Sequence, residues 1–411
     1  MKTFIFMLRK NMLFKKILII FQYIFISLYT FSLPSFSGRN TFNLISYFFM
    51  GCLVILAIIS TIIYSKFRFH WYLLIIPAFS IWAFVGTAIY SHSFRGWFSL
   101  ILMSITLFTF YFSFIFINNI KCVLKTIVFS LLLFCVYFFV IYYKDILNYK
   151  NFVGDSFRLG DYFDNVNHIG SYLIIGFAIS IYLTFFFVKK RELLYSLASL
   201  CFAFVGFTTG SRTFIISIIA SLLVILFMKF KKRKIILLIS IVSSILVFAA
   251  LINMPFLSVL KKRMFGFFGT FVTGEASETS SIQRYLWQIY GVHLGSKQLI
   301  TGYGYNGFAI YSGVGTYAHA NYSELLSNYG LIGLLLFYGA IAYMFVLAVK
   351  SNSGQFNIII IFASLFFVNS FLMVYYYDKA TYLMLAIMYY VVDSETKKRE
   401  LLSNYYYCIN I

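Results

Sequence analysis

The sequence predicts an all-α polytopic membrane protein with about twelve transmembrane helices, which form a single transmembrane domain over residues 1–411. Hydrophobic residues make up 62% of the chain and charged residues only 11%, too few charges to cover the surface of a soluble domain of this size. Most apolar stretches are about 17–25 residues long, which is enough to cross a hydrocarbon core of about 30 Å as helices. They do not alternate apolar and polar residues in steps of two, which argues against a transmembrane barrel.

The predicted spans follow the apolar runs in chain order. They lie near residues 17–33, 42–64, 69–90, 97–117, 122–143, 167–188, 193–210, 212–228, 235–254, 323–348, 357–376 and 379–392. Basic residues precede the first run, which lacks a small-residue cleavage site, so we expect a retained span and not a signal peptide. The last run is short, so the final two spans could form a tilted or re-entrant hairpin.

The basic residues predict the orientation of the chain in the membrane. The chain has 33 Lys and Arg against 12 Asp and Glu, a formal net charge of +21. In a soluble protein this excess would suggest nucleic acid. Here it gathers in short clusters between apolar runs, above all at residues 229–234, which is typical of cytoplasmic loops. We therefore expect cytoplasmic N- and C-termini, the lipid bilayer as surroundings and no nucleic-acid partner.

Two segments on the predicted outer side are longer than a simple connection. One covers residues 144–166, and the other covers residues 255–322 and carries the candidate active site. Long structured loops in compact chains usually serve a function. Five cysteines occur without any CxxC pair, so the sequence supports neither a zinc site nor a disulfide framework.

Three arginines and one histidine could carry chemistry on the outer side. Arg212 lies between two predicted spans with almost no room for a loop, where a guanidinium is costly unless it is paired. It either snorkels to lipid headgroups or clamps a pyrophosphate, whose oxygens match the guanidinium fork. Arg284 and Arg158 are assigned the same clamping role. His319 lies just before a span and is either a satisfied polar group or a base, because its usual pKa is near neutrality.

The residues around His319 also have structural interpretations. Asn321 and Glu324 fit a capping box that opens the next span, and the free N–H groups of a capped helix start favour an anion. Gly302, Gly304 and Gly307 match the G-x-G-x-x-G pattern, but no predicted strand precedes them. We therefore expect a tight turn or a close backbone approach there, and no dinucleotide site. Four outer tyrosines could stack on sugar rings or form an aromatic belt at the membrane surface: Tyr303, Tyr305, Tyr311 and Tyr317.

Three segments together resemble the O-antigen polymerase and ligase superfamily. Residues 281–335 resemble its signature loop, in which an Arg, a Trp-containing amphipathic helix, a G-x-G turn, a His and a G-x-x-G span follow one another. The matching residues are Arg284, Trp287, Gly302, Gly304, His319, Gly330 and Gly333. The segments RLGDYFDNVNHIGSYL, from Arg158, and FTTGSRTFIISI, around Arg212, resemble two further motifs of the superfamily. Many relatives have an adjacent His-Asn pair, whereas here Ala320 separates the two residues.

The resemblance implies a GT-C-like architecture and glycosyl transfer from an undecaprenyl-pyrophosphate donor at the outer face of the bacterial inner membrane. It implies catalytic roles for Arg212, Arg284 and His319, without a metal or a cofactor. It also implies a set of substrate-binding residues: Arg158, Asn167, Ser211, Tyr322 and Glu324. A flippase and a chain-length regulator are the protein partners that the same pathway suggests.

Three functions are compatible with this interpretation. A polymerase, which joins lipid-linked repeat units for capsule, O-antigen or exopolysaccharide, is favoured by the high aromatic content and by a single moderate outer loop without an added domain. A ligase would transfer the glycan to a different acceptor. A flippase is disfavoured, because transporters usually place charges inside their spans near the midplane, and the predicted spans are nearly free of charge.

Overall fold

A computed structural model describes residues 11–36, 40–64, 70–148, 159–160, 162–163, 166–187, 192–233, 235–236, 238–240, 242–243, 261, 279–351 and 353–409. These residues form helices and turns, and no strand occurs among them. Arg158, most of the predicted span at 235–254 and much of both predicted outer loops lie outside the described residues.

Eight helical stretches in the described part of the chain are long and apolar enough to cross a membrane. They are built from α2 (Met12–Phe36), α3 (Asn40–Tyr64), α4 (Ile75–Gly86) with the turns η1 (Trp71–Leu74) and η2 (Thr87–Ser91), α5 (Phe94–Ile117), α6 (Ile120–Leu147), α8 (Val166–Tyr182) with η3 (Leu183–Phe187), α10 (Arg212–Phe230) and α15 (Asn321–Val349). Two shorter apolar helices are α9 (Glu192–Thr208) and α16 (Asn357–Asn369), the latter preceded by η5 (Gly354–Phe356). The remaining helices are α13 (Thr279–Lys297), α14 (Gly307–Tyr311) and α17 (Lys379–Ile409).

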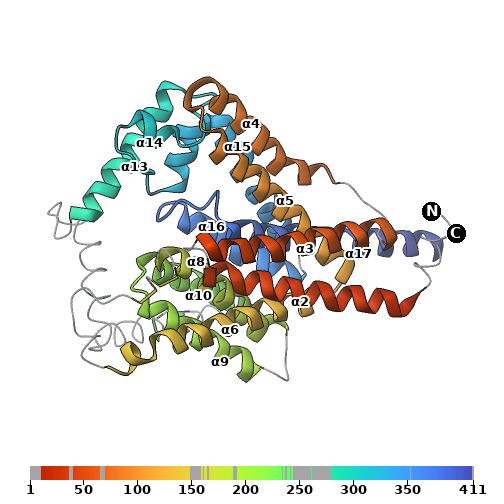
Figure 1. The fold of residues 1–411 in the computed structure, drawn as a ribbon. Coiled ribbons are helices and arrows are strands. Elements are labelled where there is room, and N and C mark those ends of the chain that lie inside the picture. Colours follow the sequence, from red (N-terminus) through yellow and green to blue (C-terminus); the bar gives the residue numbers. More distant parts are fainter. Residues whose placement is uncertain are drawn as a thin grey trace.

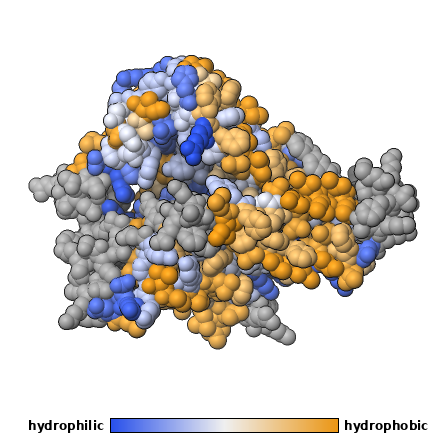
Figure 2. All heavy atoms as spheres, in the orientation of Figure 1, coloured by the Kyte–Doolittle hydropathy of each residue, from blue (hydrophilic) through white to orange (hydrophobic). Residues whose placement is uncertain are grey.

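The helices form a bundle whose most buried members are α8 and the first half of α17 (Figure 1). Around them, α2 packs on α3, α5 on α17, α15 on α4 and α10 on α16. Large apolar side chains point outward from the peripheral helices, among them Ile58, Phe129 and Val136, each more than half exposed. Figure 2 shows this apolar surface over α2 and α3, and a more hydrophilic surface over α13 and α14. This distribution is that of a multi-pass membrane protein, as predicted.

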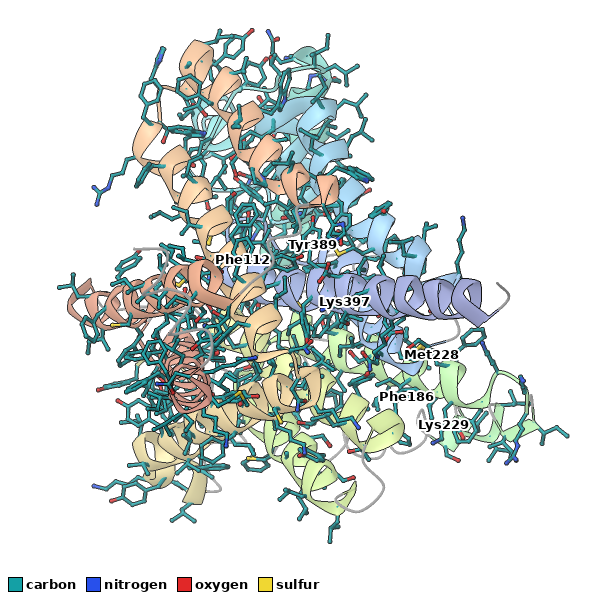
Figure 3. All side chains as sticks on the ribbon, turned by 90° about the vertical axis from the view of Figure 1, so that its right-hand side faces the viewer. Phe112, Phe186, Met228, Lys229, Tyr389 and Lys397 are labelled. Atoms are coloured by element: carbon teal, nitrogen blue, oxygen red, sulfur yellow. The ribbon has the colours of Figure 1, made fainter. Side chains whose placement is uncertain are left out.

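Helix α10 separates the candidate site from a basic cluster. It begins at Arg212, and the basic residues of the predicted inner segment follow its last turn. Within that turn the Nζ atom of Lys229 donates to the carbonyl oxygen of Phe185 in η3 at 3.2 Å. Figure 3 labels Lys229 and Phe186 in this region. The 19 residues of α10 rise by about 28 Å, close to the thickness of a hydrocarbon core. The arginine and the basic cluster therefore lie a membrane thickness apart.

The predicted span at 357–376 was wrong at its end. Helix α16 stops at Asn369, and residues 370–378, which we call the 370–378 loop, are not helical although most of them are apolar or aromatic. The side-chain Oδ1 atom of Asn321 accepts hydrogen bonds from the backbone N–H groups of Tyr375 and Tyr376, at 2.9 and 3.0 Å. Irregular backbone is tolerated at membrane depth where protein groups satisfy it. The following helix is also longer than predicted, because α17 continues to Ile409.

Helix α15 is interrupted at Gly330, whose φ of 66° and ψ of −168° are not helical. The chain just after α13 inserts at this break. The N–H group of Leu331 donates to the Leu299 carbonyl oxygen at 2.6 Å, and the indole Nε1 of Trp82 donates to the Tyr329 carbonyl oxygen at 3.0 Å. The Leu331 N–H group and the Tyr329 carbonyl oxygen, which flank the break, are therefore both hydrogen-bonded.

Gly302 and Gly304 form the tight turn that inserts at the break. Both have left-handed φ angles, 61° and 82°. A Cβ atom on Gly302 would collide with the backbone of Asn328, and one on Gly304 with the backbone of Thr87. The prediction of a turn with close backbone approach is confirmed at both glycines.

Candidate active site

Arg212, Arg284 and His319 line one cavity of about 260 Å³, although they are far apart in the sequence. The cavity lies between the start of α10, helix α13, the residues before and at the start of α15, and the 370–378 loop. The other lining residues are Thr213, Ile216, Tyr285, Gln288, Tyr322, Phe371 and Leu372. A mixed wall of cationic, amide and aromatic groups can hold an anion beside a sugar ring.

Arg212 is the first residue of α10 and is 9% exposed. The turn before it is as short as predicted, because α9 ends at Thr208 and Gly210 takes a left-handed φ of 61°. Ser211 caps the helix, and its Oγ atom accepts from the Phe214 N–H group at 3.4 Å. The guanidinium thus stands at the positive end of a helix dipole, and both favour a bound anion.

Helix α13 contributes Arg284, Tyr285 and Gln288 to the cavity. Arg284 and Gln288 are four residues apart, so they share one face of the helix. The Nε2 atom of Gln288 donates to the Phe371 carbonyl oxygen at 3.3 Å and so connects α13 to the 370–378 loop. Helix α13 and the 370–378 loop, which both line the cavity, are therefore bonded to each other.

His319 lies in a left-handed backbone conformation with a φ of 60°. Its ring is stacked on Trp287 from α13, with 5.1 Å between the ring centroids and 13° between the planes. Tyr317 covers it from another side, with a centroid distance of 4.2 Å and a tilt of 51°. Two aromatic contacts thus fix the imidazole at the wall of the cavity.

Burial and the neighbouring Arg284 guanidinium lower the pKa of His319 from its usual value to about 4. Both causes disfavour the imidazolium. The imidazole is therefore neutral at physiological pH and keeps a free nitrogen lone pair. An anion bound to the arginine would cancel part of its charge and raise the basicity of His319.

Glu324 binds the backbone of the residue before His319 and is only 2% exposed. Its Oε2 atom accepts from the Ala318 N–H group at 2.6 Å and its Oε1 atom from the Asn328 amide at 2.9 Å. The predicted capping box was wrong, because Ala320 is the N-cap residue and makes no side-chain cap bond. The Asn321 side chain instead binds the 370–378 loop. This long-range partner could not be read from the local sequence.

The remaining predicted substrate-binding residues occupy different places. Tyr322 lines the cavity, and its ring contacts that of Phe371 in a tilted arrangement, with 5.3 Å between the centroids and 50° between the planes. Ser211 and Asn167 lie beside Arg212 and bind each other, since the Ser211 hydroxyl donates to Asn167 Oδ1 at 3.1 Å. Their direct contact with a substrate stays a prediction. Arg158 lies outside the described residues.

The sequence did not predict that Trp287 and Tyr317 contact His319, or that Gln288 lines the cavity. Trp287 entered only as a motif residue and Tyr317 only as an outer aromatic residue. The spacing of four residues between Arg284 and Gln288 was a usable signal for a shared helix face. Trp287 and His319 are 32 positions apart in the sequence, and no local pattern predicts that their rings stack.

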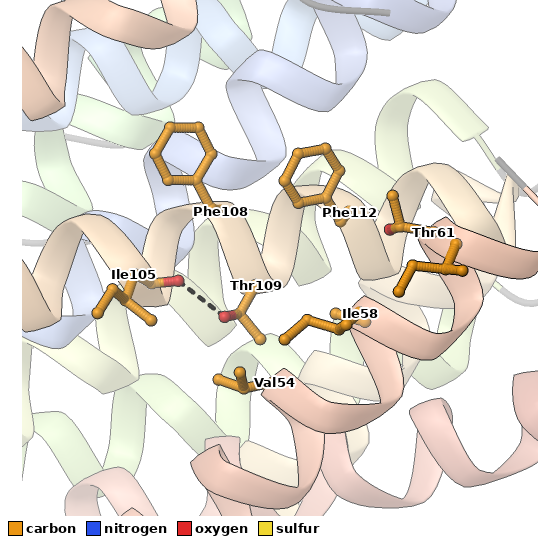
Figure 4. A pocket seen from close by; sticks show the side chains of 9 residues that line it. Val54, Ile58, Thr61, Ile105, Phe108, Thr109 and Phe112 are labelled. Atoms are coloured by element: carbon orange, nitrogen blue, oxygen red, sulfur yellow. Dashed lines mark hydrogen bonds between the residues drawn. The ribbon is translucent and has the colours of Figure 1, made fainter. Parts of the chain in front are cut away.

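A second cavity of about 300 Å³ lies between α3 and α5 (Figure 4). Aliphatic and aromatic side chains line it together with Thr61 and Thr109, and the Thr109 hydroxyl donates to the Ile105 carbonyl oxygen at 2.7 Å. None of its lining residues is ionisable, so it offers no acid, base or charged group. In the part of the chain that the structure describes, no group of three or more His, Cys, Asp and Glu side chains could hold a metal ion.

Residues 197–338 match the family model described as O-antigen ligase. The matched stretch runs from α9 into α15 and contains Arg212, Arg284 and His319. Over these residues the chain is therefore similar to the O-antigen ligase family, in agreement with its resemblance to the O-antigen polymerase and ligase superfamily. Members of this family are glycosyltransferase-like membrane enzymes that act on lipid-linked oligosaccharides. A search of curated proteins found no match to the chain.

Proposed function

We propose that this protein is a polymerase that joins undecaprenyl-pyrophosphate-linked oligosaccharide repeat units at the outer face of the bacterial inner membrane. The observation that carries the proposal is the single cavity in which two arginines from different helices face a neutral histidine. Two guanidinium groups suit a diphosphate, and an uncharged imidazole can accept a proton.

In this mechanism, Arg212 and Arg284 hold the pyrophosphate of the donor. A hydroxyl oxygen of the acceptor sugar attacks the anomeric carbon of the donor and forms the new glycosidic bond. The bond from that carbon to the pyrophosphate oxygen breaks, and lipid pyrophosphate leaves with the electron pair. His319 takes the hydroxyl proton, and the guanidinium groups stabilise the charge that grows on the leaving group. A single displacement of this kind inverts the configuration at the anomeric carbon and needs no metal.

Ligation is the second candidate, because the matching family model is described as O-antigen ligase. The proposed donor chemistry is the same in both reactions, and only the acceptor differs. The preference for polymerisation rests on the aromatic content of the chain and on the moderate size of its outer loop. Deletion of the gene separates the two: loss of a polymerase leaves single repeat units on the final acceptor, whereas loss of a ligase leaves long lipid-linked chains.

The direct experiment is reconstitution of the purified protein in vesicles with a lipid-linked repeat unit. We expect longer lipid-linked products without an ion gradient and in the presence of a metal chelator. Movement of the substrate across the bilayer without any new glycosidic bond would instead identify a transporter. A product that forms only with a lipid A core or another non-repeat acceptor would identify a ligase.

A further inference from the structure

We propose that Glu324 is a positioning residue for His319 and does not contact the substrate; this inference rests on the proposed function. Three features of the described residues carry it. They are the bonds of the Glu324 carboxylate, the backbone conformation of His319, and the rings on which the imidazole rests.

Both oxygens of the Glu324 carboxylate are occupied by protein donors. Oε2 binds the N–H group of Ala318 and Oε1 binds the side-chain amide of Asn328, at 2.6 and 2.9 Å. The side chain is buried and does not line the cavity. A carboxylate in this place would also repel the diphosphate if it faced the cavity. Its position behind the loop fits a structural link to the histidine better than a contact with the substrate.

The loop that carries His319 requires such a link. A left-handed conformation costs a non-glycine residue roughly 1–2 kcal/mol, so the surrounding structure must enforce the φ of 60°. The flanking residues Ala318 and Ala320 are fully buried. After the histidine, the Asn321 N–H group donates to the Ser370 carbonyl oxygen at 2.8 Å. Before it, the anchor is the bond from Ala318 to Glu324.

The imidazole is aligned only if this anchor holds. Its stacking on Trp287 and its contact with Tyr317 place it beside Arg284, on the cavity wall. Tyr317 is two residues from His319, so release of Ala318 would free both rings of that pair together. We expect the imidazole then to take several orientations, of which only one meets the acceptor hydroxyl.

The test replaces Glu324 in the full-length chain reconstituted in vesicles. Glu324→Gln keeps the shape but puts an N–H donor against one of the two donors that the carboxylate binds. Glu324→Asp keeps the carboxyl group but is one methylene shorter and leaves the Ala318 N–H group unbonded. For both variants we expect kcat for the lipid-linked repeat unit to fall about tenfold or more, with KM changed less than about twofold.

A second measurement needs no enzymatic activity. Diethyl pyrocarbonate modifies accessible neutral imidazoles, and mass spectrometry gives the rate for each histidine separately. We expect the rate of His319, relative to exposed His293 on α13, to rise severalfold in both variants, while that of His70 stays unchanged. His70 binds Asp393 at 2.7 Å and reports on the general integrity of the fold. The matched control is Glu395→Gln, which alters another buried acid, one that pairs with Lys398.

A raised KM with unchanged kcat and unchanged His319 reactivity would overturn the proposal and make Glu324 a substrate ligand. Unchanged values in both measurements would overturn it as well. If the unaltered protein transfers no sugar, the proposed function fails, but the modification rates still decide whether Glu324 holds His319.

Discussion

Arg212 and Arg284 reach the same cavity from different helices, and their chemistry depends on the shape of the guanidinium. Arg212 sits at a helix start, where the dipole already favours an anion, and Arg284 lines the cavity from α13. A planar fork can bind two oxygens of one phosphate, whereas an ammonium binds as a point charge. The pair therefore suits a diphosphate better than two lysines would.

At the residue scale we first expect Arg212→Lys to be nearly as damaging as Arg212→Ala. Both should lower the transfer rate by about 10²–10³, the typical cost of losing one donor to a developing anion. The measurement is the length ladder of lipid-linked product at equal protein expression, with Lys297→Ala on the exposed end of α13 as a control. A normal ladder from Arg212→Ala would remove this residue from the mechanism.

His319→Ala should also abolish the ladder while the protein is still made and inserted. Loss of a positioned base typically costs about 10²–10⁴ in rate. Western blotting of the membrane fraction gives the expression level, and gel analysis gives the product. A long-chain ladder from this variant would exclude the imidazole as the base.

The low pKa of His319 leads to a prediction about pH. Because the free enzyme holds its imidazole neutral down to about pH 4, kcat/KM should be nearly independent of pH between 6 and 8 and fall only in more acidic solution. Arg284→Gln removes one of the two causes of the shift, so the acidic limb should move upward toward the usual pKa of about 6.5. A limb that moves downward, or does not move, contradicts the assigned electrostatic contact.

The sequence predicted which residues share the cavity more readily than how they are held there. Arg212, Arg284, His319 and Tyr322 all line the cavity, and each lies in a motif or at a span boundary that could be read directly. The interpretation of Glu324 as part of a capping box failed, because the competing partner, the Ala318 N–H group, depends on how the preceding loop folds back.

At the scale of elements, apolar runs located the helices well and their ends less well. The 370–378 loop shows why. Its aromatic residues are as apolar as a span, but the amide of Asn321 offers its backbone a partner from another helix. Hydropathy measures the environment of a segment and not its conformation, so a buried loop and a helix give the same signal.

The insertion of the Gly302–Gly304 turn into the break of α15 predicts an unequal cost for two similar substitutions. Gly304→Ala and Gly313→Ala both place an alanine at a left-handed φ, at a cost of about 1–2 kcal/mol. Only Gly304→Ala also collides with backbone, whereas nothing lies within 4 Å of the position at Gly313. Overpacking of this kind adds about 1–3 kcal/mol. Thermal unfolding in detergent should therefore show a clearly lower midpoint for Gly304→Ala, and equal midpoints would contradict the close approach.

At the scale of the whole molecule, helix α10 sets the positions of the basic cluster and of the cavity relative to each other. The basic cluster that follows α10 and the cavity at its start lie at opposite ends of a helix that is as long as the membrane is thick. Clustered Lys and Arg favour the cytoplasmic side. In the orientation that we propose, the cavity faces the outer leaflet, as transfer from a lipid-linked donor on that side requires.

This arrangement makes a prediction that needs no enzymatic assay. Ile310→Cys places a thiol on α14 at a residue that is 49% exposed, and Lys232→Cys places one in the exposed basic cluster. In intact cells with a permeable outer layer, a membrane-impermeant maleimide should label Ile310→Cys above the background of the native cysteines. It should label Lys232→Cys only after the inner membrane is opened, because the proposed orientation places the basic cluster in the cytosol. The reverse pattern would place Arg212 and His319 on the cytoplasmic side and would exclude outer-face polymerisation. Labelling of both thiols in intact cells would show that the two ends of α10 do not lie on opposite sides of a membrane.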